Sequence, residues 1–476
     1  MSLSLIAHRP HIKIQPSYRK EPKRILKGCV AMAAVNNSIH DTQHHNVKKA
    51  VPVILLFFVF ALIIDNSFKL ISVEIANDLG ISASTVSWQA TLTGLVIGIG
   101  AVVYASLADS ISIRTLLSTG VILICIGSIL GFIFQGSFMM ILISRIIQTA
   151  GLASAETLYV IYVMKHLPKD EQKKFLGLST SSYSLSLVIG SLTGGYISTY
   201  LHWTTLFLIP LLTLIVLPFI MKYLPKEKSK KKHVDVLGLF LIAAIATAAM
   251  LYISYFNWIY IIVFIVSTVI FLAYISKSSK SLIEISFFKN KHYLNTLAVA
   301  FVIYTVQLGY IFIFPFLLQK VYGLELDIIS LLLIPGYVTA VIVGTLSGRI
   351  AKFLSNRQTI SIAMISISIS LILPGMFVES STIVFVFSMI LFSGSFAFMY
   401  APMLDTCVST IPKEKSGMAI GFYNLVLNVA ASIGIAYTAA MIDAIQFSTV
   451  LFILGIIAVI ALFMYWMLVG RLTNSE

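Results

Sequence analysis

The sequence predicts an all-α integral membrane protein whose fourteen transmembrane helices form two six-helix bundles with two extra helices between them. Hydrophobic residues make up 58% of the 476-residue chain and charged residues only 11%, whereas ordinary soluble chains are about 25% charged. The mean hydropathy is +0.95. Apolar runs near the roughly 20 residues that cross a bilayer recur along the chain. Basic residues gather in alternate loops between these runs, which is typical of a polytopic helical protein.

Residues 1–49 predict a basic cytoplasmic tail. They contain no apolar segment followed by a cleavage site, so they are not a typical secretory signal. The side chains of His40, Asp41, His44 and His45 allow a metal site, but the polar composition favours a disordered tail and no metal site. Met32 leaves open a natural start downstream of Met1.

Fourteen apolar segments follow the tail, and the seventh and eighth are divided only by Asn257 and Trp258. We expect the spans at 50–73, 86–107, 115–135, 138–164, 174–199, 204–223, 236–255, 257–276, 294–318, 326–348, 358–378, 382–403, 416–442 and 447–470. The hydrophilic tract at 225–235 follows the sixth span and suggests a division of the chain. The predicted organisation is an N-terminal bundle (50–223), a central segment (224–293), a C-terminal bundle (294–470) and a cytoplasmic end (471–476).

The charges in the loops predict the orientation of the chain. One set of alternate loops holds nearly all the lysines and arginines, at Arg114, Lys165 to Lys174, Lys226 to Lys232, Lys277 to Lys291, Arg349 to Arg357, and Lys413 with Lys415. The other set holds only Lys320. Because basic loops stay inside, both termini are expected in the cytoplasm. The net charge of +14 is therefore explained by the loops and does not indicate nucleic-acid binding.

The segment at 141–165 is apolar and long enough to cross a bilayer, yet it carries Arg145 and Glu156. A charge at bilayer depth costs about 2.5–3.5 kcal/mol on insertion scales, so it suggests a functional site. Helical spacing puts Arg145, Gln148 and Glu156 on one face, with Gly151 beside it. That face must line a polar pathway or meet other helices. A structural ion pair within the bundle is the alternative interpretation.

Two further charges, Asp65 and Lys69, lie one helical turn apart in the first span. From the direction of the spans, Asp65 and Arg145 share the outer half of the membrane and are expected to pair. Glu156 lies about 16 Å further along its helix, where the sequence offers no basic partner. An unpaired carboxyl in a low dielectric favours its protonated form, which suits a proton carrier. The charges of these two carboxylates and of the two basic side chains, Lys69 and Arg145, sum to zero. A proton and a cationic substrate would therefore compete for the site.

Polar residues in other spans are candidates for a substrate cavity suited to an amphipathic ligand. Packing between helices is the alternative role for such residues. The candidates are Gln89, Tyr183, Tyr304, Gln307, Asn424 and Asn428. We expect neither an enzyme nor a bound cofactor, because the sequence lacks the GxxxxGK[ST], HExxH and GxSxG motifs.

The stretch Ala105–Arg114 resembles the cytoplasmic loop motif G-x-L-a-D-r-x-G-r-k of the major facilitator superfamily, with Leu107, Asp109 and Arg114 retained. Arg145, Gln148 and Gly151 resemble the fourth-span motif R-x-x-Q-G-x-G of its fourteen-span drug:proton antiporter branch. The fifth-span antiporter motif, ending G-P-x-x-G-G, is matched by Gly190, Gly194 and Gly195, with Ser191 in place of the proline. The resemblance implies the major facilitator fold, a cytoplasmic gate at Asp109 and a proton-coupling role for Arg145.

Within that branch, several stretches are similar to the tetracycline exporters of Gram-positive bacteria, above all those of staphylococci. They are IANDL at 75–79, SW at 87–88, GLSTSSYSLSLVIG at 177–190 and LHW at 201–203. This similarity implies proton-driven export of tetracycline, as a cationic complex with a divalent metal ion, by a monomer in the bacterial cytoplasmic membrane. A multidrug or fatty-acid exporter, a proton-coupled nutrient importer and a non-transport receptor remain as alternatives.

Overall fold

A computed structural model describes residues 49–108, 110–225, 235–277, 289–350, 353–412 and 416–469, and every regular element in these ranges is helical. The predicted tail before residue 49, the tract at 226–234, the cytoplasmic end and Asp109 of the gate motif lie outside the described residues. The elements are the first helix Lys49–Leu70, α2 Ser72–Leu79, α3 Ala83–Leu107, α4 Ile113–Ile133, α5 Phe138–His166, α6 Lys169–Tyr200, η1 Trp203–Phe207, η2 Ile209–Ile215, α7 Val216–Tyr223, α8 Val236–Tyr255, α9 Trp258–Lys277, α11 Lys291–Tyr322, α12 Leu326–Ile350, α13 Asn356–Met376, α14 Thr382–Val408, α15 Ser416–Ala444 and α16 Phe447–Leu468.

Twelve helical segments of the described residues are long and apolar enough to cross a membrane. The other two expected spans, 174–199 and 236–255, coincide with α6 and α8, which are not among those twelve. An all-helical membrane protein is therefore confirmed, whereas the count of fourteen spans remains a prediction.

The first expected span is shorter than predicted, because the helix stops at Leu70 and α2 begins at Ser72. The Ser72 hydroxyl donates to the carbonyl oxygens of Lys69 (2.9 Å) and Phe68 (3.3 Å). The Gln89 amide, from α3, donates to the same Phe68 oxygen at 2.9 Å. Side-chain donors thus surround the backbone at this break.

The sixth expected span is also not a single α-helix. It consists of the two 3₁₀ segments η1 and η2, followed by α7. Pro210 lies near the start of η2 and has no N–H to donate. The Thr213 hydroxyl donates to the Pro210 carbonyl oxygen at 2.6 Å, which satisfies an acceptor in this tighter stretch.

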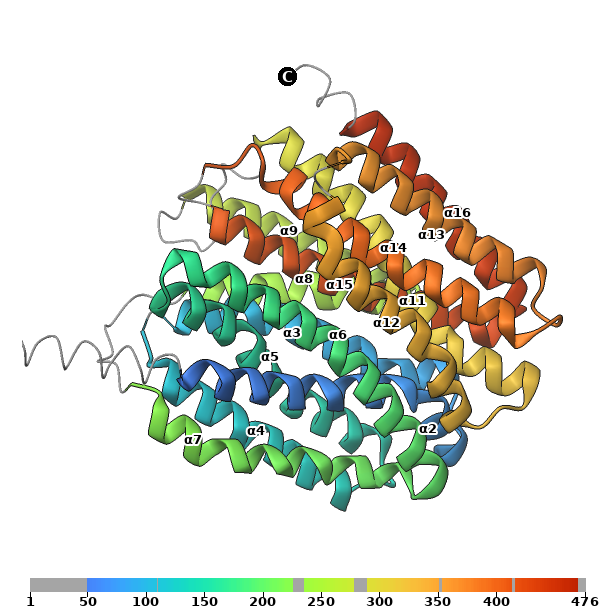
Figure 1. Cartoon of the computed structure of the whole chain (residues 1–476), viewed down its shortest axis with the longest axis horizontal. Coiled ribbons are helices and arrows are strands. Elements are labelled where there is room, and N and C mark those ends of the chain that lie inside the picture. The colour runs from blue at the N-terminus through green and yellow to red at the C-terminus, as the bar shows by residue number, and fades with distance from the viewer. Residues whose placement is uncertain are drawn as a thin grey trace, which may run out of the picture.

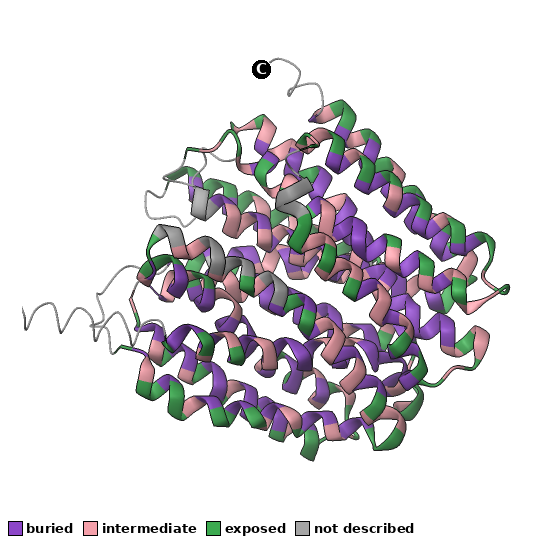
Figure 2. Ribbon diagram, in the orientation of Figure 1, coloured by how far each residue is buried: buried purple, intermediate pink, exposed green. Residues whose placement is uncertain are grey.

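The helices form two halves, the first helix to α7 and α11 to α16, which Figure 1 shows in the lower and upper parts of the molecule. Between the halves, α3 packs along α15 and α6 packs along α12. Helix α8 packs against both α3 and α15, and α9 packs on α8. Buried residues face the spaces between helices, while exposed residues lie on the outer surfaces (Figure 2). Large apolar side chains such as Ile262 and Val269 of α9 are exposed, which is expected of a lipid-facing surface.

Small residues allow the halves to approach closely. A methyl group on Gly94 of α3 would collide with Ser432 of α15, and one on Gly98 would lie 3.1 Å from Asn428. On the other side, a methyl group on Gly195 of α6 would lie 2.6 Å from the carbonyl oxygen of Leu326 in α12. Such contacts are the usual basis of tight helix packing in membranes, where the hydrophobic effect does not favour one helix over lipid.

Candidate functional site

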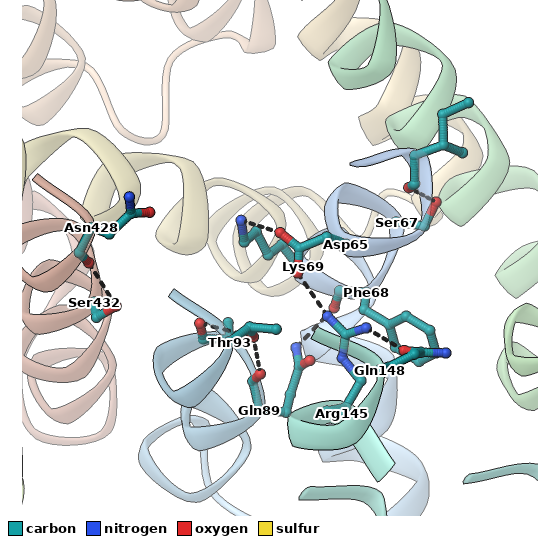
Figure 3. Close-up of polar contacts among 12 residues, drawn as sticks. Asp65, Ser67, Phe68, Lys69, Gln89, Thr93, Arg145, Gln148, Asn428 and Ser432 are labelled. Atoms are coloured by element: carbon teal, nitrogen blue, oxygen red, sulfur yellow. Dashed lines mark hydrogen bonds and ion pairs between the residues drawn. The ribbon is translucent and has the colours of Figure 1, made fainter. Parts of the chain in front are cut away.

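Arg145 of α5 and Asp65 of the first helix form a buried ion pair, with 2.8 Å between Arg145 Nη2 and Asp65 Oδ1 (Figure 3). Lys69 Nζ lies 2.6 Å from the other carboxylate oxygen, Oδ2. The three charged side chains therefore lie together, in agreement with the expected depth of Asp65 and Arg145 and with the one-turn spacing of Asp65 and Lys69. Because Asp65 neutralises only one of the two cations, the cluster carries one net positive charge.

Gln148 orients the guanidinium group. Arg145 Nη1 donates to Gln148 Oε1 at 2.6 Å, and Gln148 Nε2 donates to the Ser128 hydroxyl of α4 at 2.8 Å. The Phe68 ring lies under the guanidinium group, with its centroid 4.4 Å from Cζ. A carboxylate, an amide and an aromatic face thus replace the water that a buried arginine loses.

Glu156 lies eleven residues after Arg145 on α5 and is only partly buried. Within the described part of the chain, no hydrogen bond or ion pair holds its carboxylate. Tyr183 of α6 and Tyr400 of α14 lie within electrostatic range of it, as do Asp65 and Lys69. Tyr183 and Tyr400 belong to different halves and are 40% and 39% exposed. Glu156 therefore faces the region between the halves, and it differs from Asp65 in having no direct cationic partner.

The other candidates for a substrate cavity occupy several environments. Gln89 is fully buried and donates to Phe68 and to the Ser72 hydroxyl (2.8 Å). Tyr304 is buried against Phe396, with 5.5 Å between ring centroids.

Gln307 and Asn424 are partly buried. The Asn428 amide donates to the Asn424 carbonyl oxygen at 3.0 Å, on the face of α15 that meets α3. Substrate contact by these six residues remains a prediction.

The glycines of the motifs lie at helix contacts. Gly151 packs against the α4 backbone at Gly120, while Gly190 and Gly194 pack against the first helix at Ile63 and Ser67. Gly195 instead faces α12 of the other half. The matched fifth-span motif therefore joins α6 both to its own half and to the opposite half.

The gate motif is described in part. Leu107 is the last residue of α3, and Arg114 lies in the first turn of α4. Ser112 caps that helix, accepting a hydrogen bond from the Thr115 amide at 3.3 Å. Asp109 falls outside the described residues, so its role as a gate remains a prediction.

Several residues of the site were not expected from the sequence. Phe68 and Ser128 complete the surroundings of Arg145 but look like ordinary residues of apolar helices. The only signal for Tyr400 in the sequence is its hydroxyl group within an otherwise apolar span. Among the residues that the structure describes, no three His, Cys, Asp or Glu side chains are grouped as metal ligands would be.

Comparison with solved structures identifies the fold. The chain superposes on the POT family transporter PepTSo with a TM-score of 0.70 and 11% identity, over 90% of this chain and 98% of that one. It superposes on the xylose transporter XylE from E. coli with a TM-score of 0.63 and 13% identity, over 89% and 99%. At such low identity these matches establish only a shared fold.

Comparison of sequences leads to the family. The quinolone resistance protein NorB of Staphylococcus aureus is 26% identical over 407 residues, which cover 82% of this chain and 86% of NorB. The family model described as Major Facilitator Superfamily matches residues 53–435 and 296–475. The chain belongs to the major facilitator superfamily of membrane transporters.

Proposed function

We propose that this transporter exports an amphipathic drug across the bacterial cytoplasmic membrane in exchange for protons. The observation that carries the proposal is the contrast between two carboxyl groups of one site. Asp65 is buried and held by two cations, whereas Glu156 is partly exposed between the halves and has no direct partner. A carboxyl group in the second situation can exchange a proton for a cationic substrate.

The two carboxyl groups have different roles in this proposal. The ion pairs keep Asp65 ionised while Arg145 and Lys69 maintain a net positive charge behind it. Protonation of Glu156 removes the negative charge of a carboxylate that faces the region between the halves. A cation then binds less favourably, and loss of the proton restores its binding. Such mutual exclusion couples the two fluxes.

Tetracycline, as a cationic complex with a divalent metal ion, is the first substrate to test. The supporting observation is the similarity of the stretches at 75–79, 177–190 and 201–203 to tetracycline exporters. A quinolone is the second candidate, because relatives that align over most of the chain are named quinolone resistance proteins. Tyr183 and Tyr400 offer aromatic faces next to a carboxylate, which suits a flat cationic ligand of either class.

The test uses inverted membrane vesicles with an acidic interior, in which an outward exporter pumps drug into the lumen. Adding tetracycline with Mg²⁺ should release protons from the lumen, and the Glu156→Gln variant should give no release. Glu379→Gln is the matched control, since Glu379 is an exposed carboxylate in a loop of the second half. A quinolone is then added in place of tetracycline. If the wild-type protein is present in the vesicles and neither drug releases protons, drug–proton exchange is refuted.

The same vesicles separate the alternative functions. Competition by unrelated lipophilic cations or by fatty acids would favour a broader exporter. Proton flux that a nutrient triggers in the absence of drug, together with uptake of that nutrient by intact cells, would favour an importer.

A further inference from the structure

Among the described residues, the hydrogen bonds between the two halves gather at one end of the molecule. Five of them join described residues of the two halves, and all five involve the end that carries Asn77, Ser84, Tyr200, Asp327 and Asp443. We call this the distal end, because the basic loops at Arg114 and Arg357 are at the opposite end of the same helices. The loop charges predict that the distal end faces outward.

The two halves meet along two seams, the first where α3 packs along α15 and the second where α6 packs along α12. Asp443 forms hydrogen bonds across the first seam. It lies in the last turn of α15, and its carboxylate oxygens accept hydrogen bonds from the amides of Ala83 (3.1 Å) and Ser84 (2.8 Å). These are the first two amides of α3, which have no partner within their own helix. A carboxylate from one half thus caps a helix of the other half, where the helix dipole favours negative charge.

Asp327 makes the corresponding contact across the second seam. It lies in the first turn of α12, and its Oδ2 accepts a hydrogen bond from the Tyr200 hydroxyl at the end of α6 (2.8 Å). The Asp327 amide also donates to the Thr199 hydroxyl at 3.2 Å. Between the seams, the Asn77 amide of α2 donates to Gln319 of α11 at 3.1 Å.

The two aspartates occupy related positions. At each seam the N-terminal end of the second long helix of one half meets the C-terminal end of the fifth long helix of the other half. Asp443 lies at the C-terminal end of α15, the fifth long helix of its half. Asp327 lies at the N-terminal end of α12, the second long helix of the same half. Just inside the second contact, Gly195 brings the backbones of α6 and α12 together. The helix ends can separate only if both carboxylates give up their partners.

We propose that Asp443 and Asp327 form a two-point latch that holds the distal end closed and must release for that end to open. The latch belongs to the conformational cycle of the transporter and does not depend on which substrate is carried. Alternating access requires that each end of a transporter open in turn. Hydrogen bonds to a charged carboxylate, made at the ends of helices that must part, bias that equilibrium toward the closed state.

The test measures the opening of the distal end by the reactivity of a cysteine behind the latch. Ser87 is 3% exposed and lies one turn beyond Ser84 on α3. Cys29, Cys125 and Cys407 are replaced by serine, Ser87→Cys is added, and a membrane-impermeant maleimide is applied from the distal side. Asp443→Ala should raise the labelling rate about tenfold, because two charge-assisted hydrogen bonds are lost. Glu379→Ala, which removes an exposed carboxylate at the same end without a bond between the halves, should leave the rate unchanged.

Two conservative variants separate opening from misfolding. Asp443→Asn keeps the shape of the side chain and one acceptor oxygen, and Tyr200→Phe removes only the hydroxyl that Asp327 accepts. Each should raise the labelling rate about threefold, with less effect than Asp443→Ala. Labelling rates within twofold of the parent for both variants, in protein that elutes as a single folded species, would overturn the latch. Because no drug is added, this result is independent of whether the proposed efflux is correct.

Discussion

Arg145 and Asp65 are 80 residues apart in the chain, yet they form a buried ion pair between α5 and the first helix. Asp65 is the only carboxylate in direct contact with Arg145 among the described residues, whereas Asp65 also contacts Lys69. Removal of Asp65 leaves both Arg145 and Lys69 without their carboxylate, whereas removal of Arg145 leaves Asp65 paired with Lys69.

The first prediction is a double-mutant cycle on this pair. Asp65→Asn should lower the free energy of unfolding in detergent by about 3 kcal/mol, because Arg145 and Lys69 are then left without their carboxylate. The combined Asp65→Asn and Arg145→Gln variant should be less destabilised than the sum of the single variants, by about 2 kcal/mol. Denaturant unfolding of the four proteins measures this coupling, and additive effects would show that the pair contributes no interaction energy.

The second prediction contrasts Glu156 with Asp65. Glu156→Gln should abolish drug-dependent proton release and leave the free energy of unfolding within about 0.5 kcal/mol of wild type, since no ion pair among the described residues is broken. Thermal unfolding and vesicle proton flux are measured on the same preparation. A large loss of stability would instead identify Glu156 as a structural residue.

The third prediction concerns pH at the distal end. Burial raises the pKa of Glu74 in α2, and the nearby carboxylates of Glu325 and Asp78 raise it further. A carboxyl group whose pKa is higher in the folded than in the unfolded state favours folding most when protonated, so this contribution is lost as the pH rises through the folded-state pKa. Glu74→Gln should therefore stabilise the protein at pH 7, by a few tenths of a kcal/mol because the group is partly exposed.

The stabilising effect of Glu74→Gln should disappear below about pH 4, where the carboxyl group is protonated in both states. Thermal midpoints of the variant and wild type between pH 4 and pH 8 provide the measurement. An equal difference at every pH would mean that the titration of Glu74 is not responsible.

The fourth prediction concerns a glycine between the halves. Gly195→Ala should impair transport, because the added methyl group would lie 2.6 Å from the Leu326 carbonyl oxygen and 2.7 Å from Ser330. Gly421→Ala is the control, since a methyl group there meets nothing within 4 Å and alanine favours a helix by about 1 kcal/mol. Initial rates of vesicle transport compare the two variants. Equal activity would mean that α6 and α12 need not approach so closely.

The parts of the site predicted from the sequence are those in which a residue is costly in its setting. Asp65, Lys69 and Arg145 are conspicuous as charges within apolar segments, and they meet in the structure. Phe68 gave no such signal, because a phenylalanine in an apolar helix is common whatever it touches. The shared fold and family were likewise accessible from hydropathy and the matched motifs.

Other features depend on three-dimensional neighbours that a single span does not reveal. Asp327 and Asp443 lie near the ends of helices, where charged residues are ordinary, and only the crossing of the halves gives them partners. At the break at Ile71, the backbone oxygen of Phe68 accepts a hydrogen bond from Gln89, which belongs to another helix. Pro210 is visible in the sequence, but the replacement of an α-helix by two 3₁₀ segments is not.

The position of α8 makes the two sides of the transporter unequal toward the surrounding lipid. Helix α8 packs against α3 and α15, so α8 and α9 shield that contact, while neither of these two helices is packed on α6 and α12 in the described part of the chain. As far as the described helices go, a lipid-soluble molecule diffusing in the plane of the bilayer therefore encounters the halves directly along α6 and α12. Lateral entry, where a substrate uses it, is favoured on the side of α6 and α12, because the helix pair α8 and α9 makes the two sides of the described structure unequal.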